Sequence, residues 1–147
     1  MGCFYFDSIG VPTTDVMDRE FGDPEGWQKA RTHEWIARLA AGSEAVAVLD
    51  GQTRPSVVRS AMAQARIAHG GILLVECAVE ERNRRLSGPR GQPELATLQM
   101  ATWAAYLRGQ ADALDLPIID TTDLTIPAAI DELARWVSRL RAESGGS

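Results

Sequence analysis

Short apolar runs and longer amphipathic stretches follow one another along the chain. Four of the runs are continuously apolar and end on an acid or a cysteine, at 3–7, 45–50, 72–77 and 116–120. Runs of this length are typical of strands that are covered on both faces of a parallel sheet. We therefore predict four buried, parallel strands at these positions.

Stretches with a helical period separate the predicted strands. The recurrence of apolar residues predicts helices over about 15–21, 27–41, 56–68, 79–86, 95–114 and 126–143. Strands and helices that alternate in this way predict an α/β fold with a three-layer parallel sheet. We expect a single domain over residues 1–141 and a disordered tail over residues 142–147.

Composition narrows the function classes. The formal net charge of -5 does not favour a nucleic-acid partner or a membrane surface. No apolar run approaches the roughly 18 residues that a membrane span needs, and the N-terminus lacks the pattern of a signal peptide. The two cysteines, Cys3 and Cys77, lie in apolar runs, which favours buried thiols in a reducing compartment. We expect a cytoplasmic protein.

Acidic residues close three of the four predicted strands. They are Asp7, Asp50 and Asp120, and Cys77 closes the fourth strand. In open parallel sheets, ligands bind beyond the carboxyl ends of the strands. The sequence therefore predicts a candidate site where these strand ends meet.

The stretch VLDGQTRP carries the most specific pattern at this edge. Gly51 allows a tight turn after Asp50, and the fork of Arg54 would then project over the edge, where it can bind an anionic group. The acid would hold a hydrated divalent cation or orient a nucleophile. The alternative is an aspartate that caps the next helix and pairs with Arg54.

This stretch resembles the Asp-Gly-x-x-Arg segment of the nucleoside monophosphate kinases, which belong to the P-loop NTPases. The resemblance implies that Asp50 is the Walker B acid beside magnesium. It further implies that Arg54 grips the phosphate of the acceptor and that Gln52 belongs to the same substrate site. The likeness extends from Cys3 to about Arg139 and leaves the acceptor open.

The pair Asp7-Ser8 is similar to the element after the second strand of shikimate kinase-like and chloramphenicol phosphotransferase-like proteins. The resemblance implies that Asp7 accepts the proton of the acceptor hydroxyl or orients that hydroxyl, with Ser8 in the acceptor site. The alternative is that Asp7 caps the following turn.

Four arginines lie close together in ERNRRLSGPRG. They are Arg82, Arg84, Arg85 and Arg90. The segment resembles the lid of P-loop kinases, which implies that Arg82, Arg85 and Arg90 stabilise phosphoryl charge and that Arg82 and Arg90 contact the nucleotide. The alternative is a solvent-exposed helix whose arginines pair with the nearby glutamates Glu76, Glu80 and Glu81.

The loop after the last predicted strand contains Thr121 and Thr122. By resemblance, this loop borders the adenine of the nucleotide, so both threonines would contact the cofactor. The competing interpretation, which we favour, is that Asp120, Thr121 and Thr122 cap the last helix.

The phosphate-binding loop of the family, G-x-x-x-x-G-K-[ST], does not occur in the chain, whose only lysine is Lys29. In the family's strand order, 2-3-1-4-5, the strand before that loop lies at the centre. The strands at 45–50 and 72–77 would therefore each lack a neighbour. We expect a sequence that starts after this loop, with open strand edges that favour pairing with a second copy as a homodimer.

Two hypotheses about function follow. The first is an ATP-dependent phosphotransferase that acts on a small-molecule acceptor, with ATP and Mg²⁺ as the cofactors of the family and negligible turnover by this chain. The second is a non-catalytic module, derived from the same fold, that binds a small anion or a protein.

Overall fold

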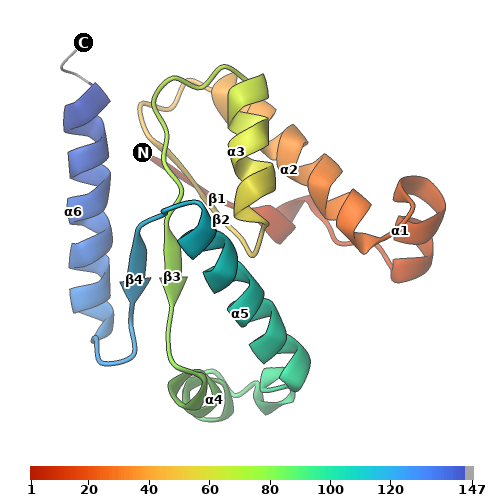
Figure 1. Ribbon diagram of the computed structural model, residues 1–147, viewed down its shortest axis with the longest axis vertical. Coiled ribbons are helices and arrows are strands. Elements are labelled where there is room, and N and C mark those ends of the chain that lie inside the picture. The colour runs from red at the N-terminus through yellow and green to blue at the C-terminus, as the bar shows by residue number, and fades with distance from the viewer. Residues whose placement is uncertain (145–147) are drawn as a thin grey trace. The chain divides into compact units, whose positions relative to one another are not determined.

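The computed structural model describes residues 1–144 and divides into two compact units (Figure 1). The first unit is Met1–Ala68, and the second begins at His69. Each unit contains one pair of parallel strands and three α-helices. The predicted α/β class with parallel strand pairing is confirmed in this coarse form, whereas the single domain over 1–141 remains a prediction.

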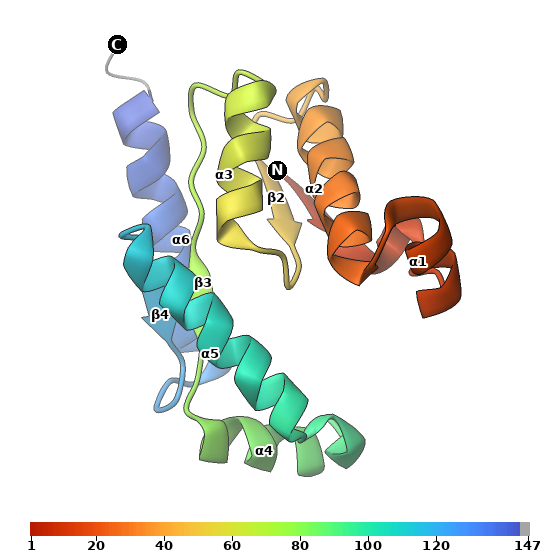
Figure 2. The same ribbon diagram turned by 45° about the vertical axis from the view of Figure 1, so that its right-hand side comes forward.

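In the first unit, β1 (Gly2–Tyr5) pairs in parallel with β2 (Ala47–Asp50). The register places Tyr5 opposite Asp50, so both strands end at the same edge. The other elements are the 3₁₀ turn η1 (Phe6–Ile9), α1 (Thr14–Phe21), α2 (Pro24–Ala40) and α3 (Pro55–Gln64). Helices α2 and α3 lie side by side (Figure 2).

An aromatic core holds the first unit together. Phe6, Met17, Trp27 and Trp35 are buried, and the rings of Phe6 and Trp27 meet edge to face with their centroids 6.0 Å apart. The Nε1 of Trp35 donates a hydrogen bond of 3.0 Å to the carbonyl of Phe6. The core therefore fixes the backbone immediately after β1, at the carboxyl edge of the strand pair.

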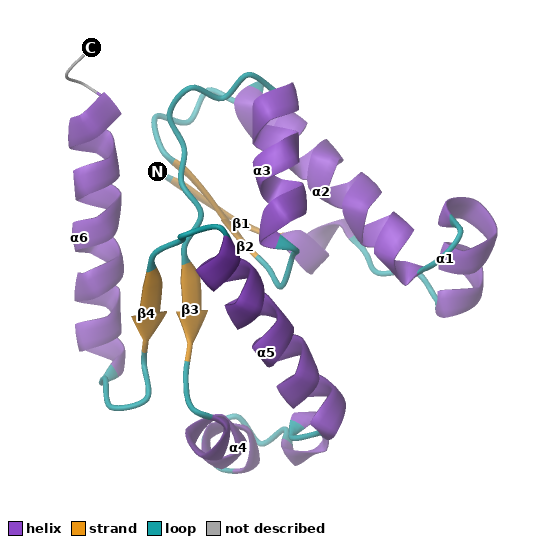
Figure 3. Cartoon of the chain, viewed as in Figure 1, coloured by secondary structure: helices purple, strands orange, loops and turns teal. Residues whose placement is uncertain are grey.

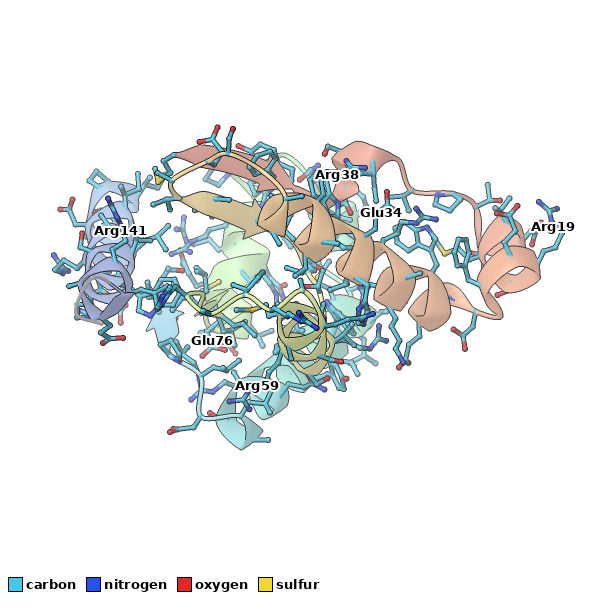
Figure 4. The ribbon with its side chains drawn as sticks, turned by 90° about the horizontal axis from the view of Figure 1, so that it is seen from above. Arg19, Glu34, Arg38, Arg59, Glu76 and Arg141 are labelled. Atoms are coloured by element: carbon cyan, nitrogen blue, oxygen red, sulfur yellow. The ribbon has the colours of Figure 1, made fainter. Side chains whose placement is uncertain are left out.

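Helix α2 begins three residues before its predicted start at Trp27. The carboxylate of Asp23 accepts a hydrogen bond of 2.6 Å from the amide of Gly26, and Pro24 occupies the first turn. The short stretch GDPEG, residues 22–26, therefore both ends α1 and caps α2. Farther along α2, Arg38 pairs with Glu34 at 3.1 Å, and Figure 4 shows the two side chains next to each other.

In the second unit, β3 (Leu74–Glu76) pairs in parallel with β4 (Ile118–Asp120). The helices are α4 (Val79–Ser87), the 3₁₀ turn η2 (Pro93–Leu95), α5 (Leu98–Ala113) and α6 (Ile126–Ser144). Buried residues of this unit include Leu86, Leu107, Ala111 and Ile119. None of the helices within residues 1–144 combines the length and the apolar character that crossing a bilayer requires.

Several element ends differ from their predicted positions. Helix α3 stops at Gln64 rather than at residue 68, because Arg66 takes a left-handed conformation with φ of 56°. Helix α6 continues through Ser144, so 142–144, which we expected in a tail, are helical. The rest of that predicted tail lies outside the described residues.

The strands are less buried than their apolar sequences predict. Figure 3 shows two separate strand pairs, and within residues 1–144 β2 pairs only with β1, and β3 only with β4. Val75, in the middle of β3, is 56% exposed, and neither Val48 nor Leu49 of β2 is fully buried. The expectation of strands covered on both faces is wrong for these residues, because the helices of the two units leave these side chains partly or largely exposed.

The cysteines also differ from expectation. Both are free thiols, Cys3 is exposed and Cys77 is half-buried. The prediction of two buried thiols is therefore wrong. Cys3 lies within β1 and Cys77 directly follows β3, so both belong to the strands whose burial the apolar pattern overestimates.

Candidate functional site

The carboxyl edge of β1 and β2 brings together two of the predicted acids. Asp50 ends β2, and Asp7 follows β1 by two residues within η1. Both side chains are exposed, and within residues 1–144 neither carboxylate makes a hydrogen bond or an ion pair. The edge of the strand pair therefore carries two exposed carboxylates that the described residues do not bind.

Gly51 allows the two strand ends to approach closely. A Cβ atom at this position would lie only 2.5 Å from the Cβ of Phe6, whose side chain belongs to the aromatic core. The backbone after Asp50 therefore passes directly against the segment that carries Asp7. The predicted glycine turn is explained by this contact rather than by an unusual backbone angle.

Arg54 is held by helix α2 rather than by Asp50. Its Nη1 donates a hydrogen bond of 2.5 Å to Oε1 of Gln28, and its Nη2 lies 3.2 Å from Oε2 of Glu25. Arg54 stands at the N-cap position of α3, and no side chain caps that helix. The alternative in which Asp50 caps the helix and pairs with Arg54 is therefore wrong.

Gln28 also fixes the loop between β2 and α3. Its Nε2 donates a hydrogen bond of 3.1 Å to the carbonyl of Gln52, whose own side chain is exposed. The first turns of α2 and the loop at 51–54, where we predicted substrate contacts, thus form one polar network. Sequence reasoning missed Glu25 and Gln28, because no local motif links α2 to a loop 24 positions away.

Asp7 and Ser8 lie next to each other in η1 but differ in their contacts. The hydroxyl of Ser8 donates a hydrogen bond of 2.7 Å to the carbonyl of Tyr5, so it already serves the turn. Tyr5 occupies the N-cap position, and no side chain caps η1. The alternative in which Asp7 caps the turn is therefore wrong, and its carboxylate remains available.

Arg85 in the second unit is bound within the protein. Its Nε donates to Glu81, its Nη1 donates to the hydroxyl of Thr121 at 2.9 Å, and its Nη2 donates to the carbonyl of Thr121 at 2.6 Å. The Thr121 hydroxyl in turn donates to the carbonyl of Glu76 at 2.9 Å. Arg85 and Thr121 therefore fasten α4 to the strand ends, where we expected phosphate and nucleotide contacts.

Thr122 has a similar internal use. Its hydroxyl donates to Oδ1 of Asp120 at 2.6 Å and accepts a hydrogen bond of 2.8 Å from the amide of Ala78. The hydrogen bonds from the hydroxyl and amide of Thr122 lower the pKa of Asp120. The amide of Ala128 donates instead to the hydroxyl of Thr125, so Thr125 caps α6 and the expectation of a cap from the preceding threonines is wrong.

The remaining lid arginines differ in their environments. Arg84 pairs with Glu81 on the exposed side of α4, and the hydrogen bonds from Arg84 and Arg85 lower the pKa of Glu81 to about 2. Arg82 has a buried Nε without a hydrogen-bond partner among the described residues. Arg90 is exposed beyond the helix. The alternative of a charged helix with internal pairs thus describes Arg84 and Arg85, and leaves Arg82 and Arg90 as ligand candidates.

Glu76 provides a further internal pairing, although it does not pair with the lid arginines. Arg108 of α5 bonds to Glu76, which is labelled in Figure 4, and to Asp112 one turn along its own helix at 3.1 Å. These two acids raise the pKa of Arg108 further above its usual value. The contact links α5 to β3, and it engages Arg108 with two carboxylates of the protein.

The expected cofactors can be compared with the residues present. Magnesium binds through one or two carboxylates together with water and phosphate oxygens, and Asp7 and Asp50 offer such oxygens. Within residues 1–144, no group of three or more His, Cys, Asp or Glu side chains could hold a metal ion. None of the four described strands is followed by a glycine-rich loop with a lysine. The described residues therefore offer carboxylate oxygens for a hydrated cation, and they do not fit tight binding of ATP.

Comparison of the chain with protein-family models, with curated proteins and with solved structures found no match.

Proposed function

We propose that this chain is the acceptor-binding part of a P-loop kinase-like phosphotransferase with a three-layer architecture. The observation that carries the proposal is the pair of exposed carboxylates, Asp7 and Asp50, at the shared carboxyl edge of β1 and β2. Arg54, which begins α3 at the end of the same loop, supplies a cation for an anionic group. An acid pair beside an arginine suits an acceptor that carries both a hydroxyl and a phosphate.

Strand pairing supports the same proposal. The strand order 2-3-1-4-5 with its first strand absent requires two parallel pairs, and it requires one strand of each pair to lack a second neighbour. β1 pairs with β2 and β3 pairs with β4, both in parallel. Neither β2 nor β3 has a second neighbour within residues 1–144. No rearrangement of the predicted elements is needed to meet this requirement.

In this role each side chain at the edge has a defined task. Asp7 accepts the hydrogen bond, and later the proton, of the acceptor hydroxyl. Arg54 binds the anionic group and fixes the acceptor's orientation. Asp50 supplies hard oxygen atoms for a hydrated cation, which in this family accompanies the phosphoryl donor. Since the residues do not fit ATP, we expect the chain alone to bind acceptors without transferring phosphate.

The test is an NMR titration of the ¹⁵N-labelled chain with inorganic phosphate and, separately, with Mg-ATP, together with a measurement of ATP hydrolysis. We expect phosphate to shift the amides of residues 50–54, Mg-ATP to bind no more tightly than phosphate, and hydrolysis to stay at background. Tight ATP binding or ATP turnover would contradict the proposal. So would a phosphate titration that leaves residues 50–54 unchanged.

A second candidate function is a non-catalytic module that binds a small anion. The buried Nε of Arg82, which lacks a hydrogen-bond partner among the described residues, favours it. A module of this kind has no use for Asp7 as a base. Replacing Asp7 by Asn would then leave the binding of a hydroxyl-bearing phosphate ester unchanged. If the chain is instead an acceptor-binding part, the same change weakens binding of that ester but not of inorganic phosphate.

A further inference from the structure

Arg54 contacts two side chains, Gln28 and Glu25, that differ in how firmly they are held. Gln28 is fixed, because its amide bonds both to Arg54 and to the carbonyl of Gln52. Within residues 1–144, Glu25 is held only through its carboxylate, which lies 3.2 Å from Nη2 of Arg54. The side chain of Glu25 is 66% exposed, whereas that of Arg54 is 17% exposed. The guanidinium is therefore well positioned, and the carboxylate is the part that can leave.

The energies involved favour exchange. An ion pair with one highly exposed partner contributes little net stability to a protein. An arginine that binds a phosphate through two parallel hydrogen bonds makes a stronger, charge-assisted contact. An anion from solution that reaches Arg54 would therefore meet a weak competitor. Gln28 would keep its bond to Nη1 and preserve the direction of the fork during the exchange.

We propose that Glu25 is an internal competitor that occupies the anion position of Arg54 until a small phosphate-bearing ligand displaces it. The proposal rests on the proposed function, in which Arg54 receives the anionic group of the acceptor. Glu25 then sets the threshold for binding, because a ligand must carry enough negative charge to replace a carboxylate. This selects phosphate dianions over singly charged carboxylates of similar size.

The experiment measures the affinity of inorganic phosphate and of acetate by isothermal titration calorimetry or NMR. It compares the parent chain with Glu25→Gln, which keeps the shape of the side chain and removes its charge. Glu20→Gln is the matched control, because Glu20 is also an exposed acid of the first unit, pairs with Arg19 at 3.2 Å and makes the same change in net charge. Arg54→Gln and Arg54→Lys test whether the arginine carries the binding, and circular dichroism confirms that each variant is folded.

We expect Glu25→Gln to bind phosphate about three- to fivefold more tightly than the parent chain, and to gain measurable affinity for acetate, because the competing charge is gone. Glu20→Gln should match the parent within twofold. Arg54→Gln should lose phosphate binding with and without Glu25→Gln, and Arg54→Lys should retain part of it.

Two results would overturn the inference, and they differ in what else they overturn. Equal phosphate affinity of the parent and Glu25→Gln, with loss of binding in Arg54→Gln, rejects the competitor and leaves the acceptor site standing. Phosphate binding that does not depend on Arg54, or that is absent from every variant, rejects both the competitor and the acceptor site on which it rests.

Discussion

Arg85 and Thr121 are joined by two hydrogen bonds across 36 positions of sequence. Nη1 of Arg85 donates to the threonine hydroxyl at 2.9 Å, and Nη2 donates to the threonine carbonyl at 2.6 Å. Thr121 is buried directly after β4, and Arg85 lies in the last turn of α4. An arginine that its sequence context assigns to phosphate binding is therefore part of the architecture of the second unit.

Replacement of Arg85 by Ala should destabilise the protein. The change removes both bonds to Thr121 and the bond to Glu81, and it leaves the Thr121 carbonyl without this donor. Hydrogen bonds that involve a charged group each contribute about 1.5–3 kcal/mol, and partial exposure reduces that value. We expect the free energy of unfolding to fall by about 2 kcal/mol in chemical denaturation followed by circular dichroism.

Arg84→Ala is the control for this measurement. Among the described residues, the guanidinium of Arg84 bonds only to Glu81 on its own helix, and its side chain is 66% exposed. An exposed pair of this type contributes little to stability. Equal losses of stability in Arg84→Ala and Arg85→Ala would show that the contact with Thr121 has no structural weight.

The course of the secondary structure could be predicted from the sequence because it depends on local patterns. Apolar runs located all four strands, and helical periodicity located all six α-helices within a few residues. Burial could not be predicted in the same way. A run such as 72–77 predicts a strand that is covered on both faces, but that cover comes from elements elsewhere in the chain. Val75 is exposed although its sequence is that of a buried strand.

The candidate site, too, could be predicted from the sequence only in part. The position of Asp7 and Asp50 at one edge follows from parallel pairing, which the alternation of strands and helices predicts. The partners of the arginines do not follow, because they lie on other elements. Arg54 pairs with Glu25 on α2, and Arg85 bonds to Thr121, which follows β4. The sequence pattern can suggest that an arginine binds an anion. It does not show whether another group of the protein already binds that arginine.

Gly51→Ala should destabilise the first unit. The added methyl group would lie 2.5 Å from the Cβ of Phe6, which is closer than carbon atoms approach without a shift. Phe6 is buried in the aromatic core, so its backbone cannot move freely away. Strain of this kind costs about 1–3 kcal/mol. Thermal unfolding should report a lower midpoint, and NMR should show shifted amides on both sides of the contact.

Gly109→Ala is the matched control, since it makes the same chemical change in open space. Gly109 lies within α5, and a Cβ atom there would meet no atom within 4 Å. Alanine is favoured over glycine inside a helix by about 1 kcal/mol, so this variant should be slightly more stable. A Gly51→Ala variant as stable as Gly109→Ala would contradict the close contact with Phe6.

Trp35→Phe should cost more stability than the loss of ring volume explains. The change removes the 3.0 Å hydrogen bond from Nε1 to the carbonyl of Phe6 and leaves that carbonyl without this donor. Trp27→Phe provides the comparison, because Trp27 is a similarly buried residue of the same core and makes no hydrogen bond through its ring in the described part of the chain. We expect Trp35→Phe to be less stable than Trp27→Phe by about 1–2 kcal/mol in denaturant unfolding.

The carbonyl of Phe6 also adjoins Asp7, so this variant connects the core with the candidate site. The amide of Asp7 shares its peptide bond with that carbonyl. Its NMR signal should therefore shift in Trp35→Phe and stay close to its parent position in Trp27→Phe. The reverse pattern would show that the hydrogen bond of Trp35 does not fix the backbone at the carboxyl edge of the strand pair.

Acid should weaken the second unit through Glu81. The hydrogen bonds from Arg84 and Arg85 lower the pKa of Glu81 from 4.5 to about 2, so the folded chain prefers the charged carboxylate more strongly than the unfolded chain does. The resulting stabilisation is complete above about pH 5 and disappears as the pH falls from 4.5 towards 2. Glu81→Gln lacks this contribution. The difference in melting temperature between the parent and Glu81→Gln should therefore be largest near neutral pH and close to zero near pH 2, whereas Glu80→Gln, on the same helix, should follow the parent. A difference that persists at pH 2 would contradict the assignment, as would a carboxyl signal of Glu81 that titrates near 4.5 in the folded chain.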